Sequence, residues 1–114
     1  MNTDFIIVLV TCGSKKEAAR LADSLLKKRL IACANIVPAV FSKFRWKGRV
    51  DSAGEALIII KTTRERFKAI EREIKRLHSY DAPEIIAIPI IEGSKEYLRW
   101  VEDNSKVKRK KPGQ

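Results

Sequence analysis

Runs of apolar residues with a strand-like character recur four times along the chain and predict a sheet. These runs are rich in Ile, Val and Phe, which favour extended backbone. The strands are expected at residues 5–11, 31–46, 50–61 and 85–91. Lys47-Gly48-Arg49 predicts a hairpin turn between the second and third strands. Pro38 lacks an amide hydrogen, so it predicts a bend or bulge and an edge position for the second strand.

Helical periodicity separates these strands. Residues 14–17 and 62–65 each place a hydroxyl three residues before a carboxylate, which is the spacing of a helix capping box. The first helix is expected to end near Arg29 and the second near His78, and Gly93-Ser94 opens a third, short helix. The apolar stripes expected on the first two helices are Ala18, Leu21, Ala22, Leu25 and Leu26, and Phe67, Ile70, Ile74 and Leu77.

The order of these elements predicts an α+β fold. It is the ferredoxin-like βαββαβ pattern, with an extra C-terminal helix and a long hairpin between the second and third strands. Two helices cover one face of such a sheet, and in a monomer the other face should show polar residues at every second position. Residues 5–10, 57–60 and 85–91 lack that alternation. We therefore expect identical chains to cover the second face, as in a closed homo-oligomer.

Length and charge divide the chain into a body and a tail. With 114 residues and no Gly- or Pro-rich linker, residues 1–105 should form a single domain. The formal net charge is +10, and half of it comes from residues 106–114, which carry +5. So polar a segment is expected to be a disordered basic tail. The tail is either a solvated end or a nonspecific contact for nucleic acid or another polyanion.

The first apolar run and the cysteines indicate a cellular location. The run from Phe5 to Val10 is too short for a membrane span or a secretory signal, so we expect a soluble, cytoplasmic protein that does not enter the membrane. Cys12 and Cys33 are far apart and should be free thiols in a reducing compartment. Cys12 precedes a helix N-terminus, which predicts either a lowered pKa and reactivity or a structural role.

The candidate site is the loop that contains the only histidine. His78 is followed by Tyr80, Asp81 and Glu84, and this mixture of nitrogen and oxygen donors suits a zinc or copper(II) ion. The alternative is that His78 only caps the second helix. Cys33 is either a further metal ligand or a small buried hydrophobe. Tyr80 and Trp46 are candidate ligand-binding residues, although Trp46 also suits the cover of a neighbouring subunit.

Five stretches together resemble the CutA family of divalent cation tolerance proteins, over roughly residues 5–102. They are residues 29–38, 46–48, 61–63, 77–86 and 96–100. The resemblance implies a homotrimer of ferredoxin-like subunits whose hairpins reach across to neighbours. It also implies a role in divalent metal tolerance, with copper binding in some members, or alternatively in signalling, anchoring or small-molecule binding at subunit clefts. Of the family's proposed copper ligands this chain keeps His78, while Leu77 and Val10 occupy the other positions.

Two other classes with this topology fit the sequence poorly. An RNA-recognition module stacks bases on aromatic residues of its central strands, but those strands read Ile6-Ile7-Val8 and Leu57 to Ile60. An acylphosphatase-like enzyme needs a glycine-rich anion loop with an arginine, and residues 11–15 contain one glycine and no arginine. We therefore expect no enzymatic activity.

Overall fold

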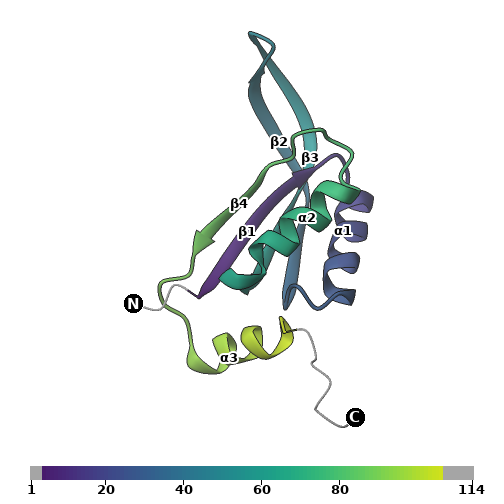
Figure 1. Ribbon diagram of the computed structural model, residues 1–114. Coiled ribbons are helices and arrows are strands. Elements are labelled where there is room, and N and C mark those ends of the chain that lie inside the picture. Colours follow the sequence, from purple (N-terminus) through teal and green to yellow (C-terminus); the bar gives the residue numbers. More distant parts are fainter. Residues whose placement is uncertain (1–3, 107–114) are drawn as a thin grey trace.

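A computed structural model describes residues 4–106, so the predicted tail lies outside the described residues apart from Lys106. The elements follow the expected order (Figure 1). The strands are β1 (Phe5–Cys12), β2 (Cys33–Trp46), β3 (Arg49–Thr63) and β4 (Ile85–Pro89), and the helices are α1 (Lys15–Lys27), α2 (Phe67–Leu77) and α3 (Lys95–Asn104). The strands form one antiparallel sheet in the order β2-β3-β1-β4. This confirms the ferredoxin-like α+β prediction.

The β2-β3 hairpin extends well beyond the rest of the sheet (Figure 1). Its register runs from Cys33 opposite Lys61 to Trp46 opposite Arg49, with one shift between Val37 and Val40. This irregularity lies beside Pro38 on an edge strand, as the missing amide hydrogen predicts. The two-residue turn at Lys47 and Gly48 has positive φ at both positions, which matches the twist of a hairpin.

The helix caps agree with the sequence only in part. Ser14 Oγ accepts from the amide of Glu17 at 3.1 Å and begins α1 as expected. The second capping box is wrong, because a short 3-10 turn (Arg64–Arg66) precedes α2 and Thr63 makes no side-chain cap. Thr62 Oγ instead donates to the carbonyl of Leu30 at 2.7 Å and fastens β3 to the segment before β2. The Thr62 hydroxyl, which the spacing assigned to a helix cap, therefore makes a tertiary hydrogen bond instead.

One face of the sheet is covered by α1 and α2. Side chains at every second position of β1 and β3 meet the apolar stripes of both helices and are fully buried or nearly so. Fully burying such a side chain contributes about 1.5–3 kcal/mol. The largest fully buried members of this core are Val8, Val10, Ile31, Ile58, Ile60, Leu21, Leu25, Ile70 and Ile74.

The other face of the sheet has no helix across it, and most of its residues are also apolar, although Lys61 and Asn35 lie on it as a hydrogen-bonded pair. Leu9 lies between Ile59 of β3 and Ile86 of β4, and Ile7 lies opposite Ile88. Ile86 is 49% exposed and Ile88 is 45% exposed. We call this surface the helix-free face. Its apolar residues are those expected from the strands in which polar residues do not occur at every second position.

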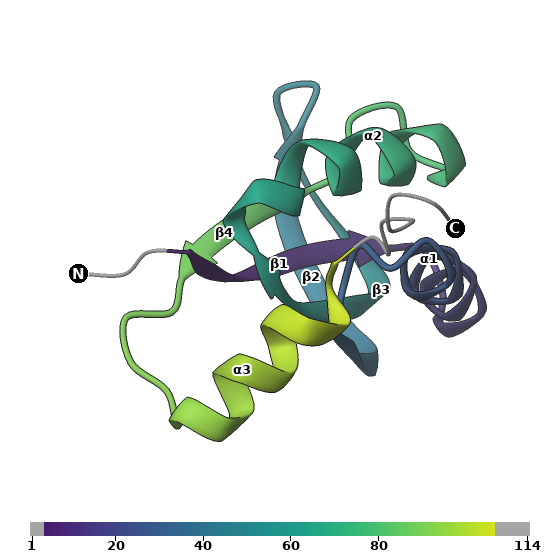
Figure 2. The same ribbon diagram turned by 60° about the horizontal axis from the view of Figure 1, so that its bottom comes forward.

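The third helix, α3, packs at the end of the sheet opposite the hairpin tip, as Figures 1 and 2 show. Val101 of α3 is buried against Phe5 and Ala32 in a second, smaller core. Ser94 Oγ caps its start by accepting from the amide of Tyr97 at 3.3 Å. The third helix therefore covers Phe5 and Ala32 at this end of the sheet and leaves Tyr97 and Trp100 exposed.

Candidate metal and ligand site

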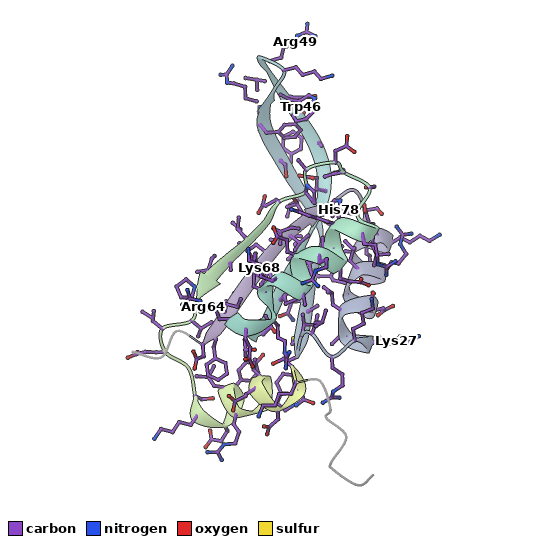
Figure 3. All side chains as sticks on the ribbon, in the orientation of Figure 1. Lys27, Trp46, Arg49, Arg64, Lys68 and His78 are labelled. Carbon is purple, nitrogen blue, oxygen red and sulfur yellow. The ribbon has the colours of Figure 1, made fainter. Side chains whose placement is uncertain are left out.

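The histidine loop, residues 78–84, connects α2 to β4 beside the base of the hairpin (Figure 3). His78 ends α2: its amide still donates to the carbonyl of Ile74 at 2.8 Å, but its own backbone is extended. The helix thus delivers the imidazole directly to the end of β1. Both the helix end and the neighbouring strand determine where this side chain lies.

The His78 ring is completely buried and uses both of its nitrogens. Nε2 lies 2.8 Å from the carbonyl oxygen of Thr11, and since a carbonyl can only accept, the ring proton is on Nε2. Nδ1 accepts from the amide of Tyr80 at 3.0 Å. In this conformation neither nitrogen offers a lone pair to a metal ion, and a ligand role for His78 requires release of the Tyr80 amide. That role stays a prediction.

Beside the imidazole is a buried carboxylate, Glu17, which the sequence analysis interpreted only as a helix cap. Its oxygens accept from the amide of Ser79 at 2.8 Å, from the Ser79 hydroxyl at 3.0 Å and from the amide of Gly13 at 3.0 Å. Burial alone would raise the pKa of Glu17, but the Ser79 and Gly13 hydrogen bonds outweigh it and hold the pKa below its usual value. Glu17 therefore ties α1 to the histidine loop as an ion.

Glu55 of β3 was also missed by the sequence analysis. Its carboxylate accepts a hydrogen bond from the Tyr80 hydroxyl at 2.9 Å. The Tyr80 ring centroid lies 4.8 Å from that of His78. Burial, followed by the hydrogen bond and the charge of Glu55, raises the pKa of Tyr80 to about 12. The tyrosine is 37% exposed, so it forms part of the outer surface of the loop. A signal for Glu17 was its position on an apolar helix stripe, but nothing local marked Glu55.

The six predicted site residues do not gather in one place. His78 and Tyr80 are in contact, and Asp81 and Glu84 are exposed on the same loop. Cys33 begins β2 opposite Lys61, toward the α3 end of the sheet, and Trp46 is 59% exposed near the hairpin tip. Within residues 4–106 no group of three or more His, Cys, Asp and Glu side chains is arranged to hold a metal ion.

Of the two alternatives predicted for Cys12, the lowered pKa is wrong. The side chain of Cys12 is fully buried, and burial raises the pKa of the thiol by more than a backbone hydrogen bond with Ser14 lowers it. The negative charges of Glu17 and Glu55 raise the pKa of Cys12 further. Cys12 has the environment of a structural, unreactive cysteine.

The described helices also bear on the membrane question. Among residues 4–106 no helix combines the length and the apolar character required to cross a bilayer.

Four antiparallel strands, two helices on one face and a projecting hairpin place the protein in the ferredoxin-like class of α+β domains. A family model described as "CutA1 divalent ion tolerance protein" matches residues 6–104. The chain belongs to this family, which confirms the resemblance inferred from the sequence motifs.

Similar proteins in several organisms support this family assignment. The divalent-cation tolerance protein CutA of Thermus thermophilus is 43% identical over 87% of this chain and 96% of that protein. A solved structure of the Thermus thermophilus protein has a TM-score of 0.88 at 42% identity, covering 90% of this chain and 99% of that one. The chloroplastic CutA of Arabidopsis thaliana is 39% identical, and the match spans 89% of this chain but 56% of that longer protein.

Proposed function

We propose that the protein acts without enzymatic activity as a homotrimer in divalent-cation tolerance. The observation that carries the proposal is the helix-free face, where β1, β3 and β4 present isoleucine and leucine at positions that a solvated sheet would fill with polar residues. Three copies in a closed ring cover these faces and leave no open end for further growth. Membership in the tolerance family supports the physiological role.

The proposed ion is zinc or copper(II), held where subunits meet. Asp81 and Glu84 are the exposed carboxylates of the histidine loop, and carboxylate oxygens are ligands for these ions. A single chain supplies too few ligands for a tight site, and the His78 nitrogens are engaged within the chain. A tight site therefore requires donors from more than one subunit, and we place it beside this loop.

Calorimetric titration with zinc and with copper tests the metal role. The test variant is Asp81→Asn with Glu84→Gln, which keeps side-chain size and removes both charges. We expect the wild type to release or absorb a saturable heat of metal binding, and we expect this variant to lose that heat. The matched control is Asp51→Asn with Glu92→Gln, which removes the same charge elsewhere and should retain the heat. The metal role is contradicted if the wild type gives no saturable binding heat, or if the wild type and the test variant give equal binding heats.

The assembly has a separate test. Light scattering at micromolar concentration should give the mass of three chains, whether or not metal is present. A mass of one chain contradicts the trimer and leaves the calorimetric result to be judged independently.

A second candidate function is the binding of a small molecule, as a signalling or anchoring module, in the clefts between subunits. The Tyr80–Glu55 pair favours it, because a half-exposed aromatic ring with a fixed hydroxyl next to a carboxylate suits a polar organic ligand. A thermal-shift screen of nucleotides and amino acids should then find a stabilising compound whose effect Tyr80→Phe reduces. A screen without such a compound contradicts this candidate.

We also propose a cytoplasmic location. Both cysteines are free, and a reducing compartment keeps thiols in that state. Cell fractionation that finds the protein outside the cytoplasm contradicts this proposal.

A further inference from the structure

Positive charge is concentrated on one layer of the molecule. Residues 15–29 and 64–76, which form α1, α2 and their ends, contain 12 Lys and Arg against 5 Asp and Glu, a net charge of +7. The rest of residues 1–105 contains 7 basic and 9 acidic residues, a net charge of −2. We call the two helical segments the helix layer. The body as a whole is only moderately basic, but its charge lies on the side opposite the helix-free face.

Among the described residues, two acidic side chains of the helix layer each pair with two cations. Glu73 is shared by Lys28 at 2.9 Å and Arg76 at 2.8 Å. Glu71 is shared in the same way by Lys75 at 3.3 Å and, more distantly, Lys68. Two carboxylates are thus shared by four cations, which leaves a net positive charge in these groups. Each of the four cations is at least half exposed.

The cations spread over the layer and line a groove. Figure 3 faces the layer, with Arg64 and Lys68 toward one side and Lys27 at the other. The groove has a volume of about 630 Å³ and runs beside Leu30 and Ala69. Its basic lining residues are Lys28, Arg72, Lys75 and Arg76.

The end of the described chain lies at the same layer. Arg29 Nε donates to the carbonyl of Lys106 at 2.9 Å, which places residue 106 beside the end of α1. The sequence continues from there with Lys108, Arg109, Lys110 and Lys111. The sequence therefore adds four further positive charges after the last described residue, which itself lies beside the helix layer.

The uncharged residues of the layer indicate the kind of polyanion. Leu26 is the one large apolar side chain of the layer that is exposed among the described residues. A membrane-surface helix needs an apolar stripe to insert between lipids, and a single-stranded nucleic acid is bound by exposed aromatic rings. The layer has neither feature. Cations without apolar or aromatic partners suit the phosphate backbone of a duplex.

We propose that the helix layer binds the phosphate backbone of duplex nucleic acid without sequence preference. This extends to the folded body a contact that the sequence analysis assigned to the tail alone. The proposal does not depend on metal binding or on the trimer, because the charged layer belongs to a single chain. In a trimer joined through the helix-free faces, each subunit presents its layer outward.

Fluorescence anisotropy with a labelled 20-base-pair DNA duplex of arbitrary sequence tests the proposal. The helix-layer variant carries Lys15→Gln, Lys16→Gln, Arg20→Gln and Lys27→Gln. The control variant removes the same charge elsewhere, by Lys43→Gln, Lys47→Gln, Lys95→Gln and Arg99→Gln. A third protein ends at Lys106. Light scattering on each protein verifies that its assembly is unchanged.

In low salt we expect the helix-layer variant to bind about tenfold more weakly, with the slope of log Kd against log salt reduced by about 2–4. The control variant should lose about twofold or less, and the protein ending at Lys106 should be weakened but still bind. The proposal is overturned if the wild type does not bind, if both four-site variants lose equally, or if truncation alone abolishes binding. Binding to vesicles of anionic lipid without binding to the duplex also overturns it.

Discussion

Both faces of the sheet are largely apolar, but their surroundings differ greatly. On the covered face Val8, Ile58 and Ile60 are completely buried by α1 and α2, whereas on the helix-free face Ile86 and Ile88 remain nearly half exposed. In β1 and β3, apolar residues also alternate between the two faces, as Val8 and Leu9 or Ile58 and Ile59 show. The comparison teaches that the apolar pattern specifies how many layers the sheet needs, and that one chain supplies one of them.

The largest expected effect comes from placing charge on the helix-free face. Ile86→Asp with Ile88→Asp would bury two uncompensated carboxylates per subunit in the proposed trimer, at a cost of several kcal/mol each. We expect the mass measured by light scattering to fall to one chain. Leu26→Asp is the control, because Leu26 is 43% exposed on the helix layer and the same change there should leave the mass unaltered.

A change on the covered face should instead destabilise the subunit itself. Ile58→Ala removes a fully buried side chain and leaves a cavity, so we expect the free energy of unfolding to fall by about 2–5 kcal/mol in chemical denaturation. Leu26→Ala, at an exposed position, should cost about 1 kcal/mol or less. Equal losses for the two variants would contradict the distinction between covered and exposed apolar residues.

Acid should weaken the covered side where Glu17 joins α1 to the histidine loop. Because the folded-state pKa of Glu17 is below its ordinary value of 4.5, its contribution is complete above pH 4.5 and is lost as the pH falls through the folded value. The stability advantage of the wild type over Glu17→Gln should therefore shrink below pH 4.5.

Denaturation of the two proteins across pH 3–7 measures this difference. The pKa of Glu73 is also lowered, by its bonds to Arg76, Ser24 and Lys28, but it titrates equally in both proteins and cancels. An advantage that stays constant with pH would show that the Glu17 charge does not stabilise the fold.

The smallest expected effect is at Tyr80, the partly exposed tyrosine of the histidine loop. Tyr80→Phe removes the hydroxyl that Glu55 accepts and should cost about 0.5–1.5 kcal/mol in the free energy of unfolding. Because Glu55→Gln keeps an acceptor for the hydroxyl, it serves as the conservative comparison and should cost less. A larger loss in Glu55→Gln would mean that the hydroxyl is not the main partner of that side chain.

Much of the fold was predictable because its signals are local. Strand and helix periodicities, the positive-φ turn at Lys47 and Gly48, and the irregularity beside Pro38 all follow from neighbouring residues. The site was less predictable, since it depends on partners far along the chain. Glu17 meets Ser79 across 62 residues and Tyr80 meets Glu55 across 25. The same kind of contact diverted Thr62 from its expected cap to the carbonyl of Leu30.

The projecting hairpin has a consequence for motion. Beyond the pair of Cys12 with Ala56, β1 no longer accompanies β3, and the outer part of β2 and β3 has only its sister strand as a hydrogen-bonded neighbour. A free two-stranded ribbon is marginally stable in water. In an isolated subunit the amide hydrogens near Trp46 would exchange with solvent far faster than those of β1, and neighbouring chains that clasp the ribbon would slow that exchange.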